Sequence, residues 1–94
     1  MHPTRTFYSA VDSLKAELKA AADPVLGALI EAYKQLKNDP WAVARGDQRQ
    51  GSGDSFAHVF YPGYVLTYRI EADFEGEATL VRQRVYLKNV LRQK

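Results

Sequence analysis

The first part of the chain places apolar residues at the spacing of an amphipathic helix. Val11, Leu14 and Leu18 recur every three or four residues, and residues with this spacing share one helix face. Ser9 lies just before them and can cap the helix, because its hydroxyl can accept a bond from a backbone N–H of the first turn. The pattern predicts a helix that begins after Ser9, with residues 4–8 ahead of it as a short strand.

A second apolar stripe follows closely. It begins at Asp23-Pro24, where aspartate is a good helix cap and proline fits the first helical turn. Its apolar members are Leu26, Leu29, Ile30, Tyr33 and Leu36. Proline disfavours helix in the residue before it, so we expect Asn38-Asp39-Pro40 to end the helix. The two stripes together predict a helical hairpin with a short loop.

The segment between Trp41 and Asp54 follows neither a helical nor a strand period, and it is rich in polar and glycine residues. Such a composition predicts a loop. Trp41 is expected to anchor the start of this loop to the core, because an indole combines a large apolar surface with an N–H donor. A base-stacking role for Trp41 is the alternative interpretation.

After the loop, the period of the apolar residues changes to two. Residues 55–61, 64–73 and 78–87 are rich in β-branched and aromatic side chains, and Pro62-Gly63 and Glu75-Gly76 separate them. They predict three strands in an antiparallel meander. The fold class expected for the chain is therefore α+β, with a short N-terminal strand, a helical hairpin and the meander. Ninety-four residues fit a single domain over residues 1–94.

The composition excludes several classes of chemistry. Without cysteine, the chain has no disulfide, no thiolate nucleophile and no cysteine-ligated metal. Its two histidines, His2 and His58, do not complete a zinc site by themselves, so we expect neither a metal nor a cofactor. No signal-peptide pattern and no run of roughly 20 apolar residues occurs. We therefore expect a cytoplasmic protein that does not enter a membrane.

Alternation along the three strands assigns every second side chain to one face of the sheet. With symmetric turns at Pro62-Gly63 and Glu75-Gly76, an apolar face packs on the helices and Arg69 lies opposite Arg82. The other face then gathers aromatic and basic side chains, which are Phe56, His58, Phe60, Arg69, Arg82, Arg84 and Tyr86. One residue inserted in the Pro62-Gly63 turn would reverse the first strand.

This basic and aromatic face is suited to single-stranded RNA. Arginines on neighbouring strands repel one another, and an anionic partner would remove that cost. Guanidinium groups bind phosphate in a bidentate manner, and aromatic rings stack on bases. The residues predicted to bind RNA or a partner are Arg45, Arg49, Phe56, Phe60, Arg69 and Lys88. Two other interpretations stay open, namely a solvated face neutralised by Glu71 and Asp73, or a contact with another protein.

Three segments carry a family resemblance. Residues 36–40, LKNDP, close the second predicted helix; residues 62–70, PGYVLTYRI, are similar to a gYRxxYxI strand; and residues 82–86, RQRVY, are similar to a terminal R…VY pattern. In this order they resemble the RelE/ParE superfamily of bacterial toxins from type II toxin–antitoxin systems. The resemblance covers nearly the whole chain, and it implies a short first strand, a helical hairpin and an antiparallel sheet.

For RelE-like members, the resemblance implies an mRNA endoribonuclease that acts on the ribosome. The 2′-hydroxyl of the message attacks the neighbouring phosphate, basic side chains stabilise the developing charge, and a late tyrosine or histidine exchanges protons. Carried over to this chain, Arg82 or Arg84 takes the place of the late arginine, and Tyr86 takes that of the tyrosine. His58 joins these catalytic candidates from the predicted register alone.

The resemblance leaves the cellular target open. Val65 stands where many members have arginine, and residues 41–54 contain no lysine. ParE-like members lack the nuclease residues and inhibit DNA gyrase, so the alternatives are a gyrase inhibitor without nuclease activity and a non-toxic protein-interaction module. For either toxin, the resemblance implies a cognate antitoxin protein that covers the arginine and tyrosine face, in a heterotetramer or larger complex.

Overall fold

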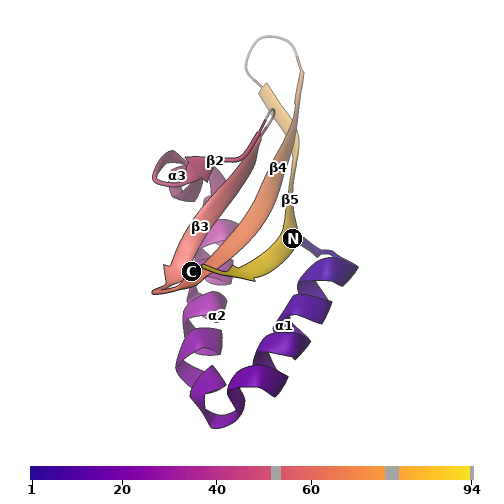
Figure 1. The fold of residues 1–94 in the computed structure, drawn as a ribbon. Helices are drawn as coiled ribbons and strands as arrows, with labels where there is room; N and C mark the ends of the chain where they lie inside the picture. The colour runs from indigo at the N-terminus through magenta and orange to yellow at the C-terminus, as the bar shows by residue number, and fades with distance from the viewer. Residues whose placement is uncertain (52–53, 76–78, 94) are drawn as a thin grey trace.

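The fold consists of helices packed on one face of a five-stranded sheet (Figure 1). The computed structural model describes residues 1–51, 54–75 and 79–93, and for residues 73–75 and 79–82 it describes the backbone alone. The sheet has the strand order β1-β5-β4-β3-β2. This arrangement confirms the predicted α+β class. Within the described residues, no helix is long and apolar enough to cross a bilayer.

The first helix begins earlier than predicted. Helix α1 spans Arg5–Leu18 and is capped by Thr4, whose hydroxyl accepts a bond from the Phe7 backbone N–H at 3.2 Å. Phe7 is buried and extends the apolar stripe back by one turn, so Ser9 lies inside the helix. The strand predicted over residues 4–8 is therefore wrong. A two-residue strand, β1 (His2–Pro3), lies just before the helix instead.

Helix α2 spans Ala22–Asn38 and follows α1 through a single 3₁₀ turn, η1 (Lys19–Ala21). It begins just before Asp23, which lies in its first turn and does not cap it. It ends at Asn38, as predicted. Asp39 then caps a further short helix, α3 (Pro40–Arg45), because its carboxylate accepts a bond from the Ala42 N–H at 3.2 Å.

The segment predicted as a loop over residues 41–54 contains two short elements. Most of α3 lies within it, and β2 (Gln48–Arg49) pairs antiparallel with the next strand. Trp41 anchors this segment as expected. Its indole N–H donates to the Gln83 side-chain oxygen at 3.0 Å, and its ring meets that of Phe56 edge to face with centroids 6.4 Å apart.

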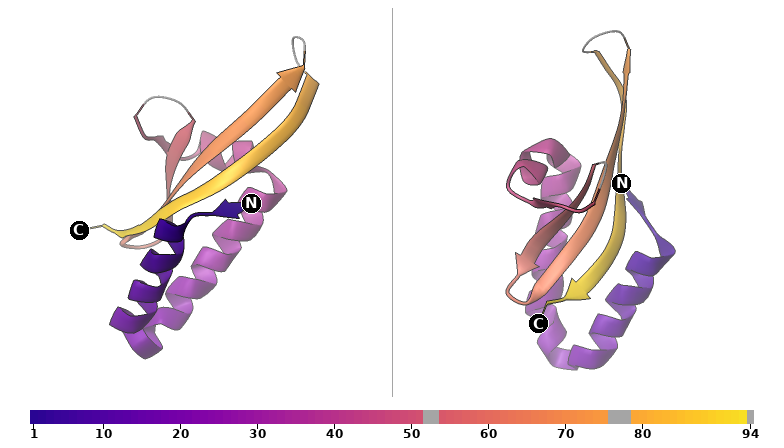
Figure 2. Two further views of the ribbon diagram at one scale, coloured as in Figure 1. Left: turned by 90° about the vertical axis from the view of Figure 1, so that its right-hand side faces the viewer. Right: turned by 45° about the horizontal axis from the view of Figure 1, so that its top comes forward.

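The meander consists of β3 (Ser55–Tyr61), β4 (Tyr64–Glu75) and β5 (Thr79–Arg92). Strand β5 continues to Arg92, beyond residue 87, where the predicted third strand ends. The sheet is nevertheless more than a meander, because β1 pairs in parallel with β5 at its outer edge and makes the sheet mixed. The hairpin of β4 and β5 projects beyond the helices (Figure 2).

The register of β4 against β5 differs from that of a symmetric turn. Arg69 pairs with Tyr86 and not with Arg82, and Glu71 pairs with Arg84. Between Tyr68 and Ala72 the displacement covers four residues, an even number, so these side chains keep their predicted face while their cross-strand partners change. Irregularities in the pairing at Thr67/Tyr68 and Asp73/Phe74 accompany this register.

Strand β3 is reversed relative to the prediction. Phe56 pairs with Tyr68 and His58 with Leu66, so their side chains point to the helix side of the sheet. The pairing shifts between Val59 and Tyr61, next to a turn that holds Gly63 at a φ of 86°. This irregularity shifts the register of β3 by one residue, and such a shift exchanges the two faces to which the side chains of a strand point. The predicted placement of Phe56, His58 and Phe60 beside the arginines is wrong.

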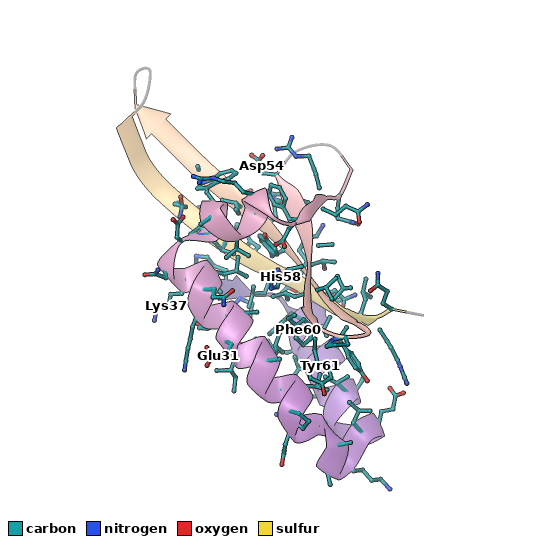
Figure 3. All side chains as sticks on the ribbon, turned by 90° about the vertical axis from the view of Figure 1, so that its left-hand side faces the viewer. Glu31, Lys37, Asp54, His58, Phe60 and Tyr61 are labelled. Atoms are coloured by element: carbon teal, nitrogen blue, oxygen red, sulfur yellow. The ribbon has the colours of Figure 1, made fainter. Side chains whose placement is uncertain are left out.

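The reversal buries the larger apolar side chains. Phe56 is 5% exposed and stacks on Tyr68 with ring centroids 5.6 Å apart, and Phe60 packs against the core (Figure 3). Had the predicted register formed, Ala57 and Val59 would fill these places and bury less apolar area. The core against which these rings pack is centred on Leu36, Leu66 and Tyr68, each fully buried between the helices and the sheet.

Candidate functional site

The helix-free face of the sheet carries a row of three side chains that come from three neighbouring strands. Tyr86 on β5 lies between His2 on β1 and Arg69 on β4, because both pair directly with it. The His2 and Tyr86 rings stack with centroids 5.2 Å apart and planes inclined by 29°. The Arg69 guanidinium carbon lies 5.9 Å from the centroid of the Tyr86 ring. An imidazole, a phenol and a guanidinium group thus share one small region, which we call the phenol row.

The surroundings of the phenol row are polar and rich in cations. Arg69 and Tyr86 line a cavity of about 340 Å³ together with Thr4, Glu71 and Lys88. Glu71 forms an ion pair with Arg69. Since β-strand pairing also places Arg84 opposite Glu71, one carboxylate lies beside two guanidinium groups, and the Lys88 ammonium adds a further positive charge. The local charge therefore favours an anionic ligand.

Three of the predicted basic residues meet on this face. Arg69, Arg84 and Tyr86 share it as predicted, and Lys88 lines the same cavity. Arg82 on β5 pairs with Asp73 on β4, but the Arg82 side chain lies outside the described part of the structure.

The two loop arginines lie elsewhere. Arg45 and Arg49 line a separate cavity with Trp41 and Phe56 near α3. The Arg49 guanidinium carbon lies 5.5 Å from the Phe56 ring centroid, and its nitrogen lies 3.6 Å from the Asp54 carboxylate. Phe56 and Phe60 pack in or against the core, so neither presents a ring to the phenol row.

His58 belongs to a different polar cluster. Its Nδ1 lies 2.7 Å from one oxygen of Asp47, and the Tyr68 hydroxyl donates to the other oxygen at 2.5 Å. An ionised carboxylate can only accept hydrogen bonds, so the arrangement assigns the Nδ1 proton to His58. The Asp47 side chain is only 7% exposed, and it fastens the segment after α3 to β3 and β4. The predicted catalytic role of His58 beside the arginines is not compatible with this position.

Burial of Tyr68, its hydrogen bond to Asp47 and the negative charge of that carboxylate raise the pKa of its hydroxyl well above the ordinary value of about 10. Because the folded state resists ionisation of Tyr68, its neutral hydroxyl contributes to the free energy of unfolding, and this contribution is fully present below about pH 10. It is lost progressively as the pH rises above the ordinary tyrosine pKa, because the unfolded chain then ionises first. We expect the free energy of unfolding to fall by about 1 kcal/mol more in the wild type than in Tyr68→Phe between about pH 10 and pH 11.

Urea unfolding at a series of alkaline pH values measures this difference. The exposed Tyr8 provides the control, because Tyr8→Phe should keep the pH profile of the wild type. Parallel profiles for the wild type and Tyr68→Phe would show that the buried hydroxyl does not resist ionisation.

Sequence reasoning missed two residues of these clusters. His2 precedes Pro3, and a residue before proline favours extended backbone, which was the one signal for a strand at that point. Asp47 lies in a segment without periodicity, so no pattern indicated that it meets His58 and Tyr68. Within the described residues, no group of three or more histidine, cysteine, aspartate or glutamate side chains is placed to hold a metal ion.

The phenol row can support proton transfer next to a bound anion. Imidazole is the side chain that most readily exchanges protons near neutral pH, a phenol holds its proton there, and guanidinium groups bind phosphate oxygens through charge-assisted hydrogen bonds. All three lie on the face that the helices leave uncovered. Comparison of the chain with protein-family models, curated proteins and solved structures finds no match.

Proposed function

We propose that the chain is the toxin of a bacterial type II toxin–antitoxin system, and that it is a RelE-like mRNA endoribonuclease acting at the phenol row. The observation that carries this proposal is the position of Tyr86 between His2 and Arg69. The pattern of residues 62–70 and 82–86, which resembles the superfamily, supports it. The proposal places the chain in the cytoplasm, with a cognate antitoxin protein and ribosome-bound mRNA as its partners.

The proposed reaction is a transesterification within the RNA strand. The 2′-oxygen forms a bond to the neighbouring phosphorus, and the bond from phosphorus to the 5′-oxygen of the next nucleotide breaks. The His2 imidazole takes the proton of the 2′-hydroxyl, and the Tyr86 phenol gives its proton to the departing 5′-oxygen. Arg69 and Lys88 stabilise the charge that develops on the phosphoryl oxygens. The products are a 2′,3′-cyclic phosphate and a free 5′-hydroxyl.

A gyrase-inhibiting toxin is the second candidate, and two observations favour it. Phe56 and Phe60, which the RNA hypothesis assigned to base stacking, pack in or against the core. On the helix-free face, Val59 and Leu91 are 55% and 47% exposed and flank Val65 in one row. An exposed apolar row of this kind is typical of a protein contact.

Induction of the chain in a bacterial host, with protein and DNA synthesis labelled separately, tests the proposal. We expect growth to stop, protein synthesis to fall first, and cellular mRNA to carry new 5′-hydroxyl ends. If DNA synthesis stops while mRNA stays intact, the result would contradict the nuclease and favour the gyrase inhibitor. Unimpaired growth without a companion antitoxin gene would contradict both toxin functions and leave a protein-interaction module.

A further inference from the structure

Three cavities form a continuous track along the helix-free face of the sheet. The cavity at the phenol row shares Thr4 and Lys88 with a second cavity, of about 450 Å³. The second shares Thr67 and Leu91 with a third, of about 570 Å³. Because cavities that share lining residues adjoin one another, a single extended ligand can contact all three. We call the third one the distal cavity.

The distal cavity has an apolar floor. Val59, Val65 and Leu91 are direct neighbours on β3, β4 and β5, and all three line the cavity. Val65 is only 8% exposed, whereas the side chains on either side of it are about half exposed. A flat apolar surface flanked by the sheet edge matches the face of an aromatic ring system.

The rim of the distal cavity carries hydrogen-bonding groups, and the charged side chains that line it are paired within the molecule. The Asp47 carboxylate contacts the His58 imidazole and accepts a hydrogen bond from the Tyr68 hydroxyl. Exposed carboxamides of Gln48 and Gln50 come from β2 and the residue after it. The one arginine of the lining, Arg92, forms an ion pair with Glu17 on α1 at 2.8 Å. The cavity at the phenol row therefore carries a net positive charge, because Arg69 and Lys88 outnumber Glu71, while the distal cavity offers amides over an apolar floor.

From this contrast, and resting on the proposed RNA-cleaving function, we infer that the distal cavity binds one adenine base of single-stranded RNA near the cleaved phosphate. The phosphates contact Lys88 and Arg69, and the base stacks on Val65 and Leu91. A carboxamide offers a donor and an acceptor side by side, which match the amino group and ring nitrogen of adenine. Guanine presents two neighbouring acceptors on its corresponding edge, which match an arginine better than an amide.

The size of the base also favours adenine over the pyrimidines in the distal cavity. Stacking on an apolar surface increases with the area of the base, and pyrimidines cover less of the floor than purines. The carboxamides at the rim then favour binding of adenine over guanine. The predicted order of preference is therefore adenine, guanine and then the pyrimidines.

Binding of 2′-O-methyl oligonucleotides tests this inference without cleavage, because the blocked 2′-oxygen does not attack the phosphate. We expect fluorescence anisotropy to show that oligoadenosine binds the wild type about tenfold more tightly than oligouridine of equal length. In the double variant Gln48→Ala/Gln50→Ala, the difference is expected to shrink to about threefold or less. Both substitutions are at exposed positions, so circular dichroism should show an unchanged fold.

Gln35 provides the matched control. It lies on α2, is exposed, and lines no part of the track, so Gln35→Ala should keep the preference of the wild type. Equal binding of the two oligonucleotides by the wild type, or an unchanged preference in the double variant, would overturn the inference.

The failure of the adenine site and the failure of the proposed function are distinguished by incubating the same proteins with cleavable mRNA bound to ribosomes. Cleavage by the wild type without preference for adenine near the cut would overturn the adenine site alone. A wild type that neither binds nor cleaves RNA, and instead inhibits supercoiling by gyrase, would overturn the adenine site and the nuclease together.

Discussion

Replacing Tyr86 with phenylalanine is expected to lower the rate of RNA cleavage by about 10²–10⁴-fold, which is the usual contribution of one proton-transferring group. The substitution removes the phenolic proton and keeps the ring that stacks on His2 and lies beneath Arg69. Because the ring contacts persist, RNA binding and the free energy of unfolding should change little. Single-turnover cleavage of a labelled mRNA bound to the ribosome measures the rate.

Tyr33→Phe is the matched control for this experiment. Tyr33 is a half-buried tyrosine of α2 on the other side of the sheet, and its variant should cleave RNA at the rate of the wild type. If Tyr86→Phe also cleaves at that rate, the phenol donates no proton. Arg69→Gln would then show whether charge alone supports the reaction, since glutamine removes the cation and keeps a polar side chain.

The largest loss of stability is expected for Leu36→Ala, at about 2–5 kcal/mol. Leu36 is fully buried in the last turns of α2, within the cluster that joins Phe7, Leu66 and Tyr68. Truncating its side chain removes apolar contacts from both the helices and the sheet, and leaves a cavity. Since small domains are typically stable by about 5–15 kcal/mol, the midpoint of urea unfolding should fall markedly.

The same helix supplies the comparison. Ile30 is 55% exposed, and alanine has a higher helix propensity than isoleucine, so Ile30→Ala should change the free energy of unfolding by no more than about 0.5 kcal/mol. Equal losses for the two variants would show that α2 does not pack on the sheet through the face that carries Leu36.

The sequence was sufficient to predict elements whose signals are local. The end of α2 was predicted because Pro40 acts on the residue before it, and the limits of β3 were predicted because Pro62-Gly63 punctuates the alternation. Trp41 was predicted as an anchor from its side chain alone, and the bond to Gln83 confirms it. Each of these signals involves neighbours in the sequence.

The orientation of β3 could not be predicted from alternation alone, because both faces of that strand contain apolar residues. Phe56 and Phe60 alternate with Ala57 and Val59, and a shift of one residue at the turn exchanges the two sets. The greater apolar area of phenylalanine was the available signal, since burial of the larger pair is the more favourable outcome.

The phenol row was predicted in part. Arg69, Arg84 and Tyr86 share a face because the side chains of strands alternate, and an even displacement of register leaves that face unchanged. The direct contact between Arg69 and Tyr86 depends on the register itself, which the irregular pairing of β4 with β5 determines. His2 was missed because a strand of two residues has no period to detect.

Strand β1 also has a kinetic consequence. Thr4 and Lys88 form a hydrogen bond although they are 84 residues apart in the chain, and contacts that close so long a loop carry a high entropic cost and tend to form late. We therefore expect His2 and Tyr86 to come together after the helices and the central hairpins have folded. A nascent chain that has not yet emerged as far as residue 86 lacks Tyr86, so we expect the proposed nuclease to become active only after β5 has emerged and paired with β1.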